Sequence, residues 1–384
     1  MESMTTAFPK LQQIDSSLHK LLGKVELLLY INPINTEKAK QQFFKSKFIE
    51  PPQFRYPKCP INSRRIRKEL FKLKIQKIEE QGIADFYEEV RWYFNGILDC
   101  LENVGKTPLF LRSSLKAFGA PTKQELEWAT TIVKAAPNFS DQTPSVKNFS
   151  AEEAVHFMKE FVSNYGFEVT VKAVTHMSSK AMVSNSKKAV LIKKGERFSA
   201  QELKALAHHE IGVHLVTTFN AEKQPLKVFS LGFPFNVQTQ EGLAVLSEYY
   251  CGALDYDRLF ELALRVITAE YVVKGVPFVE AFDTLTRTYG LSKDRAFNMV
   301  TRLYRGGGFT KDRLYLPGFV ALYQQRNKLD KDLLFAGKTS SEYTEFVVSL
   351  KANNLFSPLE YKSHSFSRQE DVDQRLESLI ELLK

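Results

Sequence analysis

The chain has 384 residues, of which 43% are hydrophobic and 25% are charged, a composition typical of a globular protein with two or three packed units. No stretch approaches the ~20 apolar residues of a membrane-spanning helix, and no secretory signal pattern opens the sequence. We therefore expect a cytoplasmic protein with no membrane partner. The three cysteines lie far apart, which argues against a disulfide framework and against a thiolate zinc site.

The net charge of +9 suggests acidic proteins, nucleic acid or anionic surfaces as partners. Much of the excess lies in residues 63–76, where basic and apolar side chains are interspersed as on an amphipathic helix. No helix-turn-helix, zinc-finger or RNP-like motif accompanies this stretch, so we interpret it as a solvated helix face. The alternative, nucleic-acid binding through residues 64–77, predicts salt-sensitive DNA retention that survives removal of zinc.

Residues 9–137 have helical periodicity, with apolar residues three and four positions apart. The segment PPQFRYPKCP interrupts this pattern with four prolines in ten residues, so it must be a loop or an extended connection. We place a domain boundary at residue 144. This divides the chain into a mostly helical N-terminal region, 1–144, and a second domain, 145–384.

Three short segments that follow predict β-strands: FEVTVKAV, AMVSNS and AVLIKK. The polar residues 185–188 would make the last two a hairpin. Helical patterns return after residue 200 and again near 240–254, 256–274, 277–289 and 292–305. The predicted fold class is α+β, mostly α-helical, with one small antiparallel sheet before the helix that begins near residue 200.

That helix opens with a capping box, since Ser199 and Glu202 can satisfy each other's backbone amides. It continues through LKALAHHEIGVHLV, which places three of the chain's seven histidines within seven residues, next to a glutamate. In zinc-peptidase helices, two histidines at i and i+4 share one face, and the glutamate after the first activates a metal-bound water. The concentration of these residue types predicts a zinc site.

The spacing of His209 and His214 departs from that pattern by one residue. On a regular α-helix they would point roughly 140° apart, whereas one π-type turn of about 4.4 residues would reduce this to roughly 50°. The sequence therefore predicts a π-bulge around Gly212, where the missing side chain makes distortion easier. Two alternatives remain open. Glu210 and His214 could be the metal ligands, or the histidines could bind no metal, with His208 and His209 partly exposed and His214 a hydrogen-bonded core residue.

A third metal ligand is offered downstream by VQTQEGLAVLSE. Thr239 is a plausible N-cap, which would place Glu241 in the first turn of a helix, where the helix dipole favours a carboxylate. Two histidines and one carboxylate leave a fourth zinc position open, as a catalytic site requires. Glu248, two turns further along the same face, is either a partner of a ligating histidine or an ordinary solvated residue.

The segments AHHEIGVHLVTTFN, QPLKVFSLGFP, TQEGLAVLSEY and RLYRGGGFTKDRLYLPG resemble the tyrosine carboxypeptidase-like metallopeptidase family. This family includes the animal microtubule-associated enzymes and bacterial proteins with a Gln-Glu-Gly-Leu-Ala motif. The resemblance covers roughly residues 199 to 325. It implies a zincin-like domain, zinc bound by His209, His214 and Glu241, and Glu210 as the general base. It also implies removal of a C-terminal tyrosine, which in animals comes from the α-tubulin tail.

We therefore expect a zinc carboxypeptidase acting on a protein or peptide C-terminal tail that ends in tyrosine or another aromatic residue. The basic charge of the chain favours an acidic tail. The substrate carboxylate requires a cation, and we nominate Arg302, Arg305 and Lys311 as substrate-binding residues. Tyr315 is the candidate stabiliser of the oxyanion. For each of these residues, a surface salt bridge or a core position is the alternative role.

The hairpin before the motif helix could also bind an extended peptide along its edge strand. Two further hypotheses compete with the carboxypeptidase. One is an aminopeptidase or endopeptidase on the same zinc site, and the other is a non-catalytic regulatory or binding protein.

Overall fold

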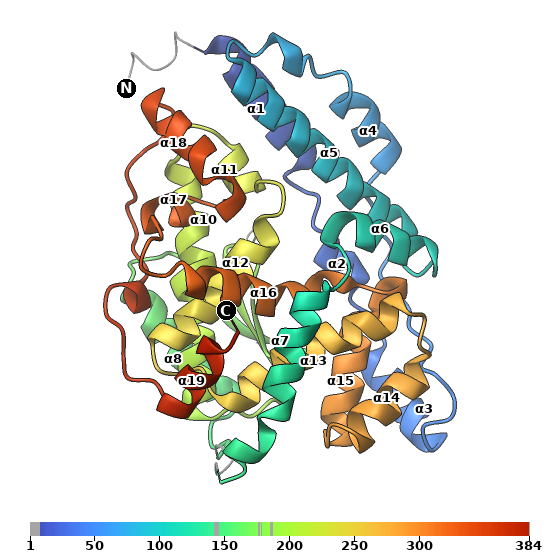
Figure 1. Ribbon diagram of the computed structural model, residues 1–384. Helices are drawn as coiled ribbons and strands as arrows, with labels where there is room; N and C mark the ends of the chain where they lie inside the picture. Colours follow the sequence, from blue (N-terminus) through green and yellow to red (C-terminus); the bar gives the residue numbers. More distant parts are fainter. Residues whose placement is uncertain (1–7, 142–145, 176, 178, 185–186, 384) are drawn as a thin grey trace. The chain divides into compact units, whose positions relative to one another are not determined.

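The computed structural model describes residues 8–141, 146–175, 177, 179–184 and 187–383 (Figure 1). These residues are mostly helical, as predicted. They form two compact units that are interleaved in the sequence: the first contains the chain up to His19, Thr131–Phe260 and residues from Tyr315 onward, and the second contains Lys20–Thr130 and Glu261–Leu314. The predicted boundary at residue 144 falls outside the described residues and stays a prediction.

The first unit holds the three strands and the motif helix. Its elements are α8 (Ala151–Ser163), β1 (Thr170–Val174), β2 (Ala181–Ser184), β3 (Ala189–Lys193), α9 (Ala200–Leu206), η3 (Ala207–Leu215), α10 (Val216–Lys223), α11 (Val228–Leu231), α12 (Asn236–Tyr250), α16 (Tyr315–Gln324), α17 (Lys331–Phe335), α18 (Thr344–Ala352) and α19 (Gln374–Glu381). The helix α1 (Pro9–Leu22) begins in this unit. None of the helices formed by the described residues combines the length and the apolar character that crossing a bilayer requires.

The described residues of the second unit form helices joined by loops, with no strand among them. It holds α2 (Leu27–Ile31), α3 (Thr36–Lys45), α4 (Ser63–Leu70), α5 (Gln81–Asn103), α6 (Leu109–Phe118), α14 (Phe278–Arg287) and α15 (Lys293–Tyr304), with most of α7 (Lys123–Lys134) and α13 (Tyr256–Val273). Its core includes the buried ring of Phe43, which packs edge-on against Phe278 and Phe282. The basic segment forms the predicted helix, but only as far as Leu70.

The sheet has the strand order β1-β3-β2 and is mixed, so the predicted fully antiparallel sheet is wrong in one pairing. β2 and β3 form the predicted antiparallel pair, with Val183 opposite Val190, whereas β1 runs parallel to β3, with Val171 opposite Val190. The reason is burial: Ala189, Val190 and Ile192 make β3 the most buried strand, so it occupies the centre and both of its edges are paired. Residues 185–186 of the predicted turn lie outside the described residues.

The helices α12 and α16 meet backbone to backbone (Figure 1). A Cβ atom added to Gly242 would lie 2.4 Å from the carbonyl carbon of Gly318, and one added to Gly318 would lie 2.1 Å from the carbonyl oxygen of Gln238. Only glycine permits this approach. The contact sets the position of α12 and of the first turn of α16.

Candidate metal centre

The motif helix is built as the local sequence predicts. The Ser199 hydroxyl accepts the Glu202 backbone N–H, and the Glu202 carboxylate accepts the Ser199 N–H, which completes the capping box and starts α9 at Ala200. α9 then continues into η3, which is π-helical from Ala207 to Leu215. The predicted π distortion is confirmed, and it extends over a longer segment than a single bulge at Gly212.

The π turn brings His209 and His214 together. Their ring centroids lie 5.0 Å apart with the planes 80° from parallel. The Nε2 atom of each ring is 3.7 Å from Oε2 of Glu241, and the potential ligand atoms of all three residues lie within 4.8 Å of one another. The structure therefore assembles the three residues that the sequence and the resemblance indicate.

These separations fit a shared metal ion better than direct hydrogen bonds. A distance of 3.7 Å is too long for a hydrogen bond. It is close to the roughly 3.3–3.5 Å between neighbouring ligands of a tetrahedral zinc with ligand bonds of ~2.0–2.1 Å. Two imidazole nitrogens and one carboxylate oxygen suit zinc and several other divalent transition metals, so the ligand set indicates the class of metal but not its identity.

The helix that carries Glu241 begins earlier than predicted. Phe235 adopts a left-handed conformation, with φ of 56°, and α12 starts directly after it at Asn236. Thr239 is therefore inside the helix, and the predicted N-cap is wrong. Its hydroxyl instead accepts the backbone N–H of Ser341. Glu241 lies in the second turn of α12 rather than in the first.

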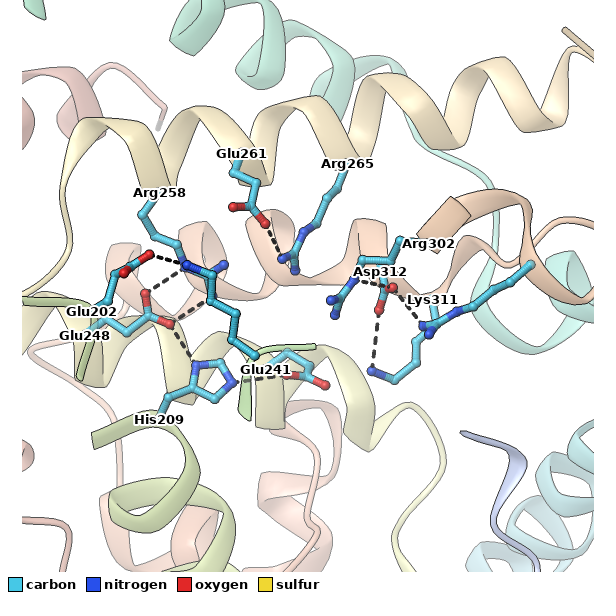
Figure 2. A network of polar contacts seen from close by, with 12 residues as sticks. Glu202, His209, Glu241, Glu248, Arg258, Glu261, Arg265, Arg302, Lys311 and Asp312 are labelled. Atoms are coloured by element: carbon cyan, nitrogen blue, oxygen red, sulfur yellow. Dashed lines mark hydrogen bonds and ion pairs between the residues drawn. The ribbon is translucent and has the colours of Figure 1, made fainter. Parts of the chain in front are cut away.

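Glu248 lies two turns further along α12 and is 2% exposed. One of its oxygens, Oε1, is 2.7 Å from Nδ1 of His209, and both of its oxygens accept N–H groups of Arg258 (Figure 2). Burial would raise the pKa of Glu248, but Arg258 and His209 lower it to about 2. Arg258 lies outside every motif of the sequence, so the sequence analysis did not identify it.

The surrounding carboxylates make this group attractive to cations. Burial by itself lowers the pKa of His209, yet the contacts with Glu241 and Glu248 and the charge of Glu210 raise it to about 9. The negative charges that favour a proton on the His209 ring also favour a divalent cation bound to the ring instead of that proton. The electrostatics therefore agree with the geometry.

Glu210 is buried but stands apart from the ligand group. Its Oε2 atom accepts the backbone N–H of Val183 on the edge strand β2, at 2.9 Å. The alternative pair of Glu210 and His214 is thus not the group whose ligand atoms converge. The sequence analysis did not anticipate the contact with Val183, because it depends on how β2 packs against η3.

Two further residues are relevant to the ligand group, Tyr315 and His208. Tyr315, the first residue of α16, is buried, and its ring lies nearly parallel to that of His209, with the centroids 6.3 Å apart. His208 instead packs edge-on against Phe161. Of the three consecutive motif residues His208, His209 and Glu210, only His209 joins the ligand group.

The nominated substrate-binding residues lie in the second unit, around the buried carboxylate of Asp312 (Figure 2). Arg302 Nε, Arg305 Nη2 and Lys311 Nζ lie 2.6, 3.1 and 3.9 Å from it, respectively. Burial would raise the pKa of Asp312, but the charges of Arg302, Arg305, Lys311 and Arg265 lower it to about 2. The three residues come together, but around an internal acid that the sequence analysis did not consider. Their role in substrate binding stays a prediction.

Comparison with known proteins extends the match beyond the metal centre. The family described as microtubule-associated tyrosine carboxypeptidase matches residues 41–384. Microtubule-associated tyrosine carboxypeptidase 1 of Mus musculus is 23% identical over 333 residues, which cover 83% of this chain and 61% of that protein. The Rattus norvegicus protein of the same name is 23% identical over 332 residues, with the same coverage.

The chain thus spans less than two thirds of the length of these relatives. The family match includes most of both compact units and every candidate site residue. It confirms the resemblance indicated by the motifs. This chain belongs to the microtubule-associated tyrosine carboxypeptidase family.

Proposed function

We propose that the protein is a zinc-dependent carboxypeptidase that removes a C-terminal residue, tyrosine or another aromatic, from a protein or peptide tail. The observation that carries this proposal is the convergence of the potential ligand atoms of His209, His214 and Glu241. Membership of a carboxypeptidase family supports the reaction type, and the names of the relatives support tyrosine as the residue removed.

The two histidines and Glu241 would hold the metal, and a bound zinc would supply Lewis acidity to the scissile carbonyl and to a water molecule. Glu210 acts as the general base. Its Oε2 atom is held by the Val183 N–H, which orients the carboxylate so that Oε1 takes the proton of the attacking water and returns it to the leaving amine.

Two further roles in the reaction are proposed, one for Tyr315 and one for the basic residues around Asp312. The Tyr315 hydroxyl donates to the oxyanion that develops as the carbonyl is attacked. Arg302, Arg305 and Lys311 bind the terminal carboxylate of the substrate. Arg302 has the most exposed side chain of the three, at 19%, and is the first choice for this role. The net charge of +9 favours an acidic tail.

A peptide panel tests the reaction. The zinc-loaded protein is incubated with peptides that differ only in the last residue, and the products are identified by mass spectrometry. We expect release of a terminal tyrosine and no release from the matched C-terminal amide. Internal cleavage would instead support an endopeptidase, and loss of the first residue, blocked by N-acetylation, would support an aminopeptidase. Zinc binding with no turnover of any peptide would support a non-catalytic binding protein.

The variant Glu210→Gln separates chemistry from metal binding. We expect kcat to fall by about 10²- to 10⁴-fold, because the proton acceptor is lost, while the zinc content of the purified protein is unchanged. His214→Ala is the matched comparison and should lose zinc. If Glu210→Gln also lost zinc, Glu210 would be a ligand and the assignment of His209 would be wrong.

A further inference from the structure

We propose that Arg258 is a positioning residue of the metal centre, which aims the Nε2 atom of His209 at the metal by holding the carboxylate of Glu248 in one orientation. The proposal rests on the proposed function, since it assumes that His209 is a metal ligand. It adds a residue that belongs to none of the motifs.

The contact between the two side chains is bidentate. Arg258 Nε donates to Oε2 of Glu248 and Arg258 Nη2 donates to Oε1, both at 2.9 Å. Paired N–H groups fix the plane of a carboxylate as well as its distance. Oε1 is also 2.7 Å from Nδ1 of His209 (Figure 2). One carboxylate thus links α13, α12 and η3.

The orientation of Glu248 determines which nitrogen of His209 faces the metal. Both carboxylate oxygens accept hydrogen bonds from Arg258, so the ring contacts an acceptor and Nδ1 must be the protonated nitrogen. A neutral imidazole with a proton on Nδ1 presents its lone pair on Nε2. That is the atom that lies 3.7 Å from Glu241. Partners of this kind also hold the orientation of a ligating ring.

The connection between α12 and α13 holds the arginine in place. The carbonyl oxygen of Glu248 accepts the backbone N–H groups of Ala253 and Leu254, which ends α12. The Asp255 carboxylate accepts the backbone N–H of Arg258 in the first turn of α13. These bonds set the separation of Glu248 and Arg258, which are ten residues apart. The side chain of Arg258 is 24% exposed, so the pair is largely shielded from water.

A second arginine of the same unit provides a matched control. Arg326 donates to the Glu381 carboxylate at 3.0 Å and lies over the Tyr323 ring. Its side chain has the same 24% exposure as that of Arg258. Arg326→Met therefore removes an equally exposed arginine from an arginine–carboxylate pair in which Glu248 and the metal ligands take no part.

The test measures zinc affinity by competition with a chromophoric chelator, on folded protein and without any substrate. We expect Arg258→Met to weaken zinc binding by roughly 10- to 100-fold, and Arg258→Lys to weaken it less, since an ammonium group cannot form the paired contact. Arg326→Met should match the wild type. Nitrogen NMR of the histidine rings in the zinc-loaded proteins should show His209 protonated on Nδ1 in the wild type and a mixture of the two tautomers in Arg258→Met.

Unchanged affinity and an unchanged His209 tautomer in Arg258→Met, with tight zinc binding in the wild type, would overturn this inference and leave the proposed function intact. Absence of zinc binding in the wild type would overturn both. If Arg258→Met fails to fold, Arg258→Lys is compared in the wild-type and Glu248→Gln backgrounds. An effect that disappears in Glu248→Gln supports action through that carboxylate, and an equal effect in both backgrounds contradicts it.

Discussion

Glu248 and Asp312 are two buried carboxylates held by arginine, each with a pKa lowered to about 2, and they lie in different units of the protein. Glu248 joins its arginine to a histidine of the ligand group, whereas Asp312 is surrounded by cations. The same electrostatic arrangement therefore supports a candidate metal centre in one unit and an internal ion cluster in the other. The residues around the paired carboxylate therefore indicate the role of an arginine better than the sequence motif in which the arginine lies.

The largest expected effect comes from removing Asp312. Asp312→Ala leaves the buried Arg305 and the partly buried Arg302 without their shared carboxylate, so we expect the free energy of unfolding to fall by about 3–5 kcal/mol, measured by urea denaturation. Zinc affinity of the folded variant should be unchanged, which would sharpen the contrast with Glu248. A loss below about 1 kcal/mol would show that the arginines are well solvated without Asp312.

The stability of the wild type should also depend on the ionisation of Asp312 at acid pH. The pKa of Asp312 is about 2 when folded, against its ordinary 3.8, so its stabilisation is present above pH 3.8 and is lost as the pH falls from 3.8 to 2. The contribution is about 2 kcal/mol. Denaturation of the wild type and of Asp312→Asn across this range should show a stability difference that shrinks toward pH 2. A constant difference would contradict the assignment.

The metal centre should also be sensitive to a change that removes no charge. In Gly242→Ala the new Cβ meets the Gly318 backbone, so we expect a loss of about 1–3 kcal/mol and weaker zinc binding, since Glu241 is the adjacent residue. The control is Gly96→Ala in α5, where a Cβ meets no atom within 4 Å and stability should rise by up to ~1 kcal/mol. Thermal unfolding and chelator competition measure both effects.

The smallest effect is expected at Gly212, inside the π-helical segment. A Cβ there would lie 3.4 Å from the Tyr165 hydroxyl and 3.6 Å from the Ser363 hydroxyl, which are ordinary contacts. Gly212→Ala should therefore change the free energy of unfolding by less than about 1 kcal/mol and leave zinc affinity nearly unchanged. A large loss of zinc binding would show that the π turn itself depends on glycine.

Much of the candidate site follows from local sequence. The capping box at Ser199 and Glu202 places the start of the helix, and the five-residue interval from His209 to His214 requires a π turn if both are to bind one ion. Glu241 was identified by its motif, although its place in the helix was predicted one turn too early. These features depend on backbone geometry within a few residues, which the order of residue types encodes directly.

Features that depend on contacts between distant segments could not be predicted from sequence. Three such features are known only from the packed structure. They are the parallel pairing of β1 with β3, the hydrogen bond from the Val183 N–H to Glu210, and the ion pairs of arginines with Asp312 and Glu248. Gly242 illustrates the contributions of both local sequence and tertiary packing. Its motif marked the helix of the candidate metal ligand Glu241, but only the approach of α16 shows why the residue must be glycine. Sequence determined which groups could bind a metal, and tertiary packing determined which of them are held in position to do so.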